Sequence, residues 1–219
     1  MGTLTKETTE LLERYFDAAA NLYGIITLSK LLHIYNSQNE PITEEQITEF
    51  ADTFDHSKKF YYIVSEDEMY DNVEDTKPMD REIVAEYLVM DYGDDELTYY
   101  YVKEEQAGKE YYVPKKEKLL RYEEDAYFEK TLSFISLRAF FRNLPGMDKE
   151  RADMVAENLE LDAQLGEGDI GNAMDTLSRF QVKLNDRQMD EFASLFYDMF
   201  MDSRLHIHRG HSTREILSI

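Results

Sequence analysis

The chain has 219 residues, which is enough for one large domain or two small ones. Its formal net charge is -22 at pH 7 and its pI is about 4.5, a balance that repels phosphate backbones and anionic lipids and therefore argues against direct DNA binding and membrane attachment. The chain contains no cysteine, so disulfides, thiol catalysis and Cys-ligated metal sites are excluded.

The hydropathy pattern predicts neither a secretory signal nor a membrane span. The N-terminal residues contain no basic region followed by an apolar run. No stretch approaches the roughly 18 apolar residues that cross a bilayer. The absence of cysteine suits a reducing compartment, so we expect a cytoplasmic protein.

Residues 1–64 are predicted to form three helices followed by a strand. Apolar residues recur at helical spacing over 7–23 and over 27–35. The third helix begins with the capping box 43–46, Thr-Glu-Glu-Gln, and the aromatic and aliphatic run 60–64 follows it. This order resembles a winged-helix unit, so we describe the segment as winged-helix-like.

The third helix of this unit carries no positive charge. In a DNA-binding winged helix, the third helix would read the DNA. Here it presents Glu44, Glu45, Glu49 and Asp52, which cannot lie among phosphates. A winged-helix-like shape therefore does not predict DNA reading in this chain.

Residues 65–125 form an acidic, Tyr-rich middle segment that contains β structure. Residues 83–90 are ambiguous between a buried strand and a short helix, and their Val, Ile and Tyr content favours the strand. The carboxylates are too evenly spread to single out a catalytic pair, so a solvated acidic face is the favoured interpretation. The residues predicted to contact a partner are Glu66, Asp67, Glu68, Asp94, Asp95, Glu96, Tyr99 and Tyr100.

Residues 126–219 are predicted to be a helical bundle. Apolar stripes at helical spacing are joined by short connections, which is typical of antiparallel neighbouring helices. Asn185 and Gln188 form a capping pair before the last long stripe. The whole chain is therefore predicted to be α+β and predominantly α-helical, with segments 1–64, 65–125 and 126–219.

Three histidines near the C-terminus allow two interpretations. His206, His208 and His211, with Asp202 or Glu215, would suit a transition-metal site if the segment were extended. Alternatively, they form a His-rich helix end, where cations favour the helix dipole. We favour the second interpretation because no further ligand pair is evident, and we expect no metal or other cofactor.

The arginines of the same region predict a structural clamp. Gly210 permits a tight turn that would place Arg204, Arg209 and Arg214 beside helices rich in carboxylate. Arginine binds carboxylates in a bidentate manner, so the tail is expected to clamp onto the acidic body. An alternative is that the same Arg and His residues bind an external anion, such as a phosphate or a nucleic-acid end.

The C-terminal segment also resembles a motif of the form T-R-hydrophobic-aromatic-x-x-x-G-H-T-P-x-E-L. It occurs in uncharacterised proteins of Gram-positive bacteria that often continue into a zinc-binding SEC-C tail. Residues 21–26 and 111–122 are similar to that group as well. The sequence departs from the pattern at Ser203 and Thr213, and it lacks the cysteines of a zinc tail. The resemblance implies a bacterial protein but no established reaction. The motif residues are Arg204, Arg209, Gly210, His211, Arg214 and Glu215.

These observations lead to one expected function and two alternatives. We expect a non-enzymatic interaction or regulatory module whose acidic, Tyr-rich surface binds a basic protein surface. The first alternative is an inhibitor of phage or mobile-element type that imitates nucleic acid and occupies a nucleic-acid-binding protein. The second is a metal-dependent enzyme that uses His206, His208 and His211.

Overall fold

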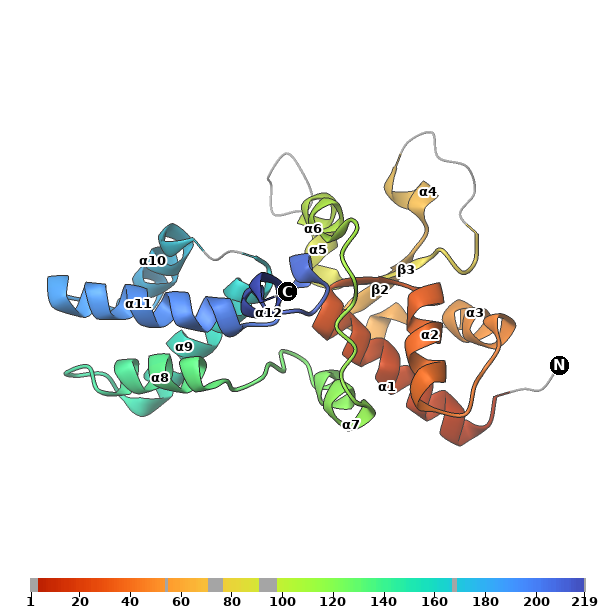
Figure 1. Ribbon diagram of the computed structural model, residues 1–219, viewed down its shortest axis with the longest axis horizontal. Helices are drawn as coiled ribbons and strands as arrows, with labels where there is room; N and C mark the ends of the chain where they lie inside the picture. Colours follow the sequence, from red (N-terminus) through yellow and green to blue (C-terminus); the bar gives the residue numbers. More distant parts are fainter. Residues whose placement is uncertain (1–3, 54, 71–76, 91–97, 167–168, 219) are drawn as a thin grey trace. The chain divides into compact units, whose positions relative to one another are not determined.

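The computed structural model describes residues 4–53, 55–70, 77–90, 98–166 and 169–218 (Figure 1). The chain divides into two compact units, Met1–Tyr127 (unit 1) and Phe128–Ile219 (unit 2). This division lies next to the predicted boundary at residue 126, and the predicted middle segment 65–125 lies within unit 1. The predicted class, α+β and predominantly α-helical, is confirmed. Within the described ranges, no helix is long and apolar enough to cross a membrane.

Unit 1 begins with three helices, as predicted. They are α1 (Lys6–Tyr23), α2 (Leu28–Gln38) and α3 (Glu44–Asp52). A threonine precedes each helix and accepts a hydrogen bond from a free N–H of the first turn, which is the usual role of an N-cap residue. The predicted capping box of α3 is present, because Gln46 Oε1 accepts from the Thr43 N–H at 2.9 Å. Gly24, at a φ of 68°, ends α1.

A small antiparallel sheet follows from these helices. Its strands β1 (Ile25–Thr27), β2 (Tyr61–Val64) and β3 (Glu82–Ala85) lie in the order β1-β3-β2. The central strand pairs Ile83 with Ile26 on one side and with Ile63 on the other. The strand predicted at 83–90 is therefore right for its first residues only. The winged-helix-like description stays a prediction.

The second half of the predicted strand is a short helix, α5 (Glu86–Val89). The β2 ladder ends at the pair Tyr61 and Ala85, and β1 reaches only to Val84 on the other side. The Glu86 N–H still donates to the Phe60 carbonyl at 2.8 Å, but beyond this bond the ladder stops and the chain continues as a helical turn. The Val and Ile content of the segment cannot reveal where the neighbouring strands stop.

Helix α1 runs through the core of unit 1. Its side chains Tyr15, Phe16, Leu22 and Tyr23 are almost completely buried. The Tyr23 hydroxyl donates to the Tyr112 carbonyl at 2.8 Å, so its polar end is satisfied inside the core. The remaining elements of unit 1 are η1 (His56–Lys58), α4 (Glu66–Met69), α6 (Thr98–Gln106), α7 (Lys116–Leu119) and η2 (Leu120–Glu123).

Unit 2 is a helical bundle, as predicted. Apolar faces of its helices share one core that contains Phe134, Phe141, Leu159, Phe192 and Met199. The predicted Asn185–Gln188 pair is a capping box, with the Asn185 N–H donating to Gln188 at 3.0 Å. The elements are α8 (Leu132–Arg142), α9 (Lys149–Gln164), α10 (Ile170–Arg179), α11 (Asp186–Asp202), η3 (His206–His208) and α12 (Thr213–Leu217).

Candidate partner-binding surface and C-terminal motif

Short helix α4 presents three of the predicted partner-binding residues. Glu66, Asp67 and Glu68 are all exposed on it. The helix begins at Ser65, whose N–H donates to Glu68 Oε2 at 2.7 Å. A carboxylate in the first turn also faces the positive end of the helix. The sequence therefore favours a helix in a segment whose like charges repel one another.

Helix α6 holds α4 in place through Tyr100 and Lys103. The Tyr100 hydroxyl donates to the Met69 carbonyl, and the rings of Tyr70 and Tyr100 lie 5.1 Å apart. Lys103 Nζ lies 3.6 Å from Glu66. These contacts bring acidic and aromatic side chains together on one surface. We call it the acidic-tyrosine surface, and it consists of Glu66, Asp67, Glu68, Tyr70, Tyr100 and Glu104 around Lys103.

The structure corrects the prediction for Tyr99. Its side chain is fully buried, because Tyr99, Val102 and Gln106 share the face of α6 that packs inward. Its hydroxyl donates to Glu82 Oε2 at 2.6 Å, and burial together with that carboxylate raises the pKa of the phenol. Tyr99 therefore stabilises the unit and cannot touch a partner. The predicted residues Asp94, Asp95 and Glu96 lie outside the described residues.

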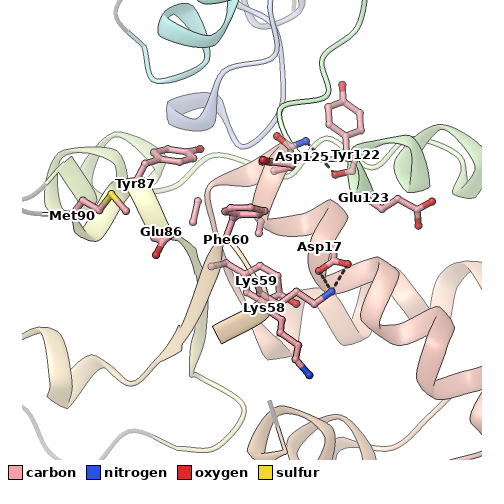
Figure 2. Close-up of a pocket in the computed structure, with 14 residues that line it drawn as sticks. Asp17, Lys58, Lys59, Phe60, Glu86, Tyr87, Met90, Tyr122, Glu123 and Asp125 are labelled. Atoms are coloured by element: carbon pink, nitrogen blue, oxygen red, sulfur yellow. Dashed lines mark hydrogen bonds and ion pairs between the residues drawn. The ribbon is translucent and has the colours of Figure 1, made fainter. Parts of the chain in front are cut away.

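Unit 1 also contains a pocket that the sequence did not indicate. Its volume is about 350 Å³, and its walls come from α1, the start of β2, the end of β3 with α5, and η2 (Figure 2). Phe60 and Met90 stand open to solvent at 63% and 42% exposure. The lining residues are Asp17, Ala20, Asn21, Lys58, Lys59, Phe60, Tyr61, Ala85, Glu86, Tyr87, Met90, Tyr122, Glu123 and Asp125.

An ion pair closes one side of this pocket. Lys59 Nζ lies 2.8 Å from both carboxylate oxygens of Asp17 and 2.9 Å from Glu13. Burial raises the pKa of Asp17, although the bond with Lys59 acts in the opposite direction. Burial and the charge of Asp17 also raise the pKa of Tyr61. Lys59 is thus occupied by two carboxylates within its own unit.

The other charges of the pocket leave a negative excess. Arg14 Nη2 donates to Glu123 at 3.1 Å, and Lys58 lies 3.6 Å from Asp55. Among the described residues, neither Glu86 nor Asp125 forms an ion pair with lysine or arginine. Open apolar walls next to these carboxylates can hold a group that is both apolar and cationic.

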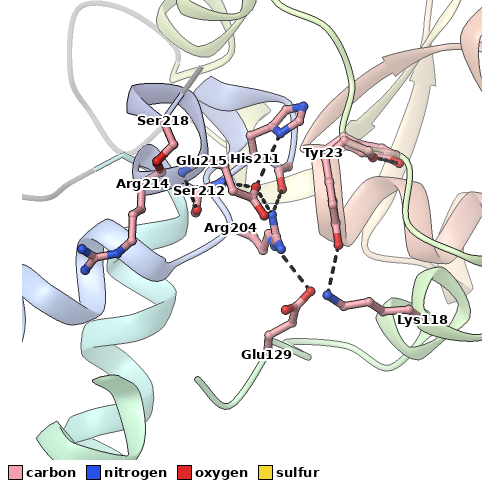
Figure 3. Close-up of polar contacts among 11 residues, drawn as sticks. Tyr23, Lys118, Glu129, Arg204, His211, Ser212, Arg214, Glu215 and Ser218 are labelled. Atoms are coloured by element: carbon pink, nitrogen blue, oxygen red, sulfur yellow. Dashed lines mark hydrogen bonds and ion pairs between the residues drawn. The ribbon is translucent and has the colours of Figure 1, made fainter. Parts of the chain in front are cut away.

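Arg204 and Arg214 of the C-terminal motif bind carboxylates within unit 2, as expected for these residues, and Figure 3 shows the contacts of Arg204. Arg204 donates to Glu215 and, at 3.4 Å, to Glu129. Arg214 Nε donates to Asp202 at 2.5 Å. Burial alone would raise the pKa of Glu215, but its bonds with Arg204 and the Ser212 backbone outweigh that effect and lower it.

The predicted tight turn is also present. Gly210 has a φ of 82°, and its N–H donates to the Leu205 carbonyl at 3.0 Å. Arg209 precedes it in the left-handed region, with a φ of 50°. The turn sets His211 beside Glu215, with Nδ1 at 3.5 Å from the carboxylate. The motif therefore packs the chain end against its own unit.

The metal alternative at the three histidines stays a prediction, although this geometry does not bring their side chains together as it assumed. Within the described part of the chain, no group of three His, Asp or Glu side chains could hold a metal ion, and His206, His208 and His211 lie in that part. The alternative assumed an extended segment. Residues 206–208 instead form a 3₁₀ turn, in which side chains two positions apart point in different directions.

Unit 2 also contains a buried carboxyl group that was not predicted from the sequence. Glu160 on α9 is only 2% exposed, and Ser203 Oγ lies 2.8 Å from its Oε2. Burial raises the pKa of Glu160 to about 8, against a smaller opposite effect of Ser203. A signal was present in the sequence. Glu160 lies four residues after Ala156 and three before Ala163, and thus on the apolar stripe of its helix.

The chain was compared with protein-family models, with curated proteins and with solved structures. The resemblance to proteins of Gram-positive bacteria stays a prediction after these comparisons. None of the three comparisons found a match.

Proposed function

We propose that this protein is a non-enzymatic interaction module, which binds a basic surface of another protein through unit 1. The observation that carries the proposal is the acidic-tyrosine surface. Contacts between α4 and α6 bring exposed carboxylates next to the rings of Tyr70 and Tyr100. The net charge of -22 strengthens the attraction of this surface for a cationic partner.

Charge and aromatic side chains contribute differently to such binding. Carboxylates steer a basic partner and fix its orientation, so they act mainly on the association rate and on specificity. Tyrosine supplies contact area at a low cost in side-chain entropy and is enriched at interfaces. Glu66, Asp67 and Glu68 are exposed, whereas catalytic carboxylates are usually buried or coupled to a neighbour. These properties favour binding over chemistry at α4.

We place this function in the cytoplasm. The reason is compositional, because a chain with no cysteine suits a reducing compartment. The partner would be a protein with clustered Lys and Arg, and the class of nucleic-acid-binding proteins meets this description. The chain itself is not expected to bind DNA, since its charge opposes phosphate.

The test is a charge-reversal experiment on the full-length protein with an octalysine peptide as the probe. Replacing Glu66, Asp67 and Glu68 by lysine should weaken binding about tenfold in low salt, because the local attraction becomes repulsion. Isothermal titration calorimetry over a series of salt concentrations gives both the affinity and its electrostatic share.

The control makes the same change in net charge on unit 2. Asp175, Asp190 and Glu191 are exposed there, and their replacement by lysine should weaken binding less than about threefold, through the long-range field alone. Equal losses in the two triple variants would show that the peptide responds only to net charge. The proposed site would then be incorrect.

A further inference from the structure

We infer that the pocket of unit 1 receives an arginine side chain of the partner, flanked by its apolar or uncharged neighbours. This inference rests on the proposed function and names the chemistry of the group that the partner inserts. The pocket holds about 350 Å³, which suits one or two side chains and excludes a folded element.

The apolar walls of the pocket favour the binding of a flat or apolar group. Phe60 is 63% exposed and Met90 is 42% exposed, although both are large apolar side chains. The backbone of Phe60 is held next to α5, because its carbonyl accepts the Glu86 N–H at 2.8 Å. Exposed apolar area of this kind next to a cavity is typical of a binding site. An occupant that covers Phe60 removes this area from water.

The carboxylates of the pocket favour the binding of a positively charged group. Glu86 and Asp125 line the pocket from two different segments, Glu86 at the start of α5 and Asp125 just after η2 (Figure 2). Burial raises the pKa of Tyr87, and the negative charge of Asp125 raises it further. The lysines of the pocket already have carboxylate partners, Lys59 with Asp17 of the pocket wall and Lys58 with Asp55. The uncompensated charge is therefore negative.

Segment 122–127 is held so that Asp125 stays in the pocket wall. Asn21 Nδ2, from α1, lies within hydrogen-bond distance of the carbonyls of Tyr122, Glu124 and Tyr127, at 3.2, 2.9 and 3.3 Å. A carboxylate on a fixed segment loses less freedom when it binds a ligand. The pocket is therefore prepared for a cation before the partner arrives.

Arginine meets these requirements better than lysine. Its guanidinium is planar, stacks on aromatic faces and is more weakly hydrated than an ammonium. It can also bind a carboxylate through two parallel hydrogen bonds. Phe60 and Tyr87 offer aromatic faces, and Asp125 and Glu86 offer the carboxylates. Lysine supplies the charge but neither the flat surface nor the fork of donors.

The experiment follows the methyl signal of Met90 by NMR in the full-length protein with isotope-labelled methionine. The probes are three acetylated and amidated tripeptides, with arginine, lysine or citrulline between two alanines. Citrulline keeps the shape of arginine and lacks its charge. Met90→Leu assigns the signal, and Met154 on α9, 52% exposed, serves as the control methyl group.

The expected result is a saturable shift of Met90 with the arginine probe and none of Met154. The lysine probe should bind about threefold more weakly, and citrulline should not saturate. The double change Asp125→Asn and Glu86→Gln should weaken arginine binding about fivefold, and Phe60→Ala should do the same. Glu124→Gln, an exposed neighbour outside the pocket, should change it less than about twofold.

Several results would overturn the inference. Equal shifts of the Met90 signal with the arginine and citrulline probes would show that charge plays no part in binding. Unchanged binding by the Asp125 and Phe60 variants would show that the probe binds at another site. A Met90 signal that depends on protein concentration without a probe would identify a second copy of this chain as the occupant. The octalysine experiment at α4 is independent of Met90. If octalysine binds at α4 as expected but the arginine probe does not bind at Met90, the pocket is not the arginine site, and the proposed function is unaffected.

Discussion

Replacing the buried Glu160 by glutamine tests the electrostatics of unit 2. Ser203 Oγ lies 2.8 Å from Glu160 Oε2 and 2.8 Å from the Met199 carbonyl. A serine hydroxyl has one proton and cannot donate to both acceptors. Both contacts are satisfied if Glu160 is protonated and donates to Ser203, while Ser203 donates to Met199. The amide of glutamine can make the same donation without a titratable proton.

The size of the effect follows from the pKa of Glu160, which rises from 4.5 to about 8 in the folded chain. The native state then holds its proton more tightly than the unfolded state does. The free energy of unfolding is therefore highest below about pH 4.5, falls as the pH rises, and levels off above about pH 8. One pKa unit corresponds to about 1.4 kcal/mol. Relative to its value at low pH, the free energy of unfolding is therefore lower by about 3 kcal/mol at pH 7 and by about 5 kcal/mol above pH 8.

The change Glu160→Gln should abolish this part of the pH dependence. Urea denaturation followed by circular dichroism, at several values between about pH 5 and pH 9, measures it. The variant should be similar to the parent near pH 5 and more stable by about 3 kcal/mol or more at pH 8.

Glu157→Gln on the same helix is the matched control, since Glu157 is half-buried and, in the described part of the chain, Ser203 bonds to Glu160 and Met199 instead. It should leave the slope unchanged. A difference between Glu160→Gln and the parent that stays constant with pH would refute the reasoning. It would mean that Glu160 is ionised in the native state.

Three substitutions test the fold itself, each measured by urea denaturation. Gly210→Ala should lower the free energy of unfolding by about 1–2 kcal/mol, because the residue has a φ of 82° and alanine is strained there; an unchanged free energy would contradict the turn. Thr43→Ala should cost about 1 kcal/mol through loss of the N-cap of α3, and Thr43→Ser should restore most of it. Phe141→Ala should cost about 3–5 kcal/mol, since the ring is fully buried against Phe192; a loss below about 1 kcal/mol would place it outside the core.

Local signals made much of the fold predictable. The capping boxes at Thr43 and Asn185 involve residues three positions apart, so the sequence displays them directly. The turn at Gly210 could be predicted as well, because glycine adopts the left-handed backbone conformation of such a turn without strain. The arginine clamp followed from charge, although which carboxylates it binds depends on packing.

Non-local features could not be predicted in the same way. The pocket joins Asp17, Phe60, Glu86 and Asp125, which lie on four separate segments, and only tertiary packing brings them together. The end of β3 at Ala85 depends on where its neighbours stop.

The burial of two further residues could have been predicted from their helical spacing. Tyr99 has the helical spacing of Val102 and Gln106, yet its position in a Tyr-rich run suggested a surface. Glu160 has the spacing of the apolar stripe on α9, but a charged residue is rarely expected in a core.

Amide hydrogen exchange of the full-length protein, with and without saturating octalysine peptide, tests the central claim most directly. The claim is that the negative charge of unit 1 faces outward to bind a basic partner. The prediction is protection concentrated at α4 and α6, with little change in α9–α11 of unit 2 (Figure 1). Equal protection across both units, or protection confined to unit 2, would contradict it.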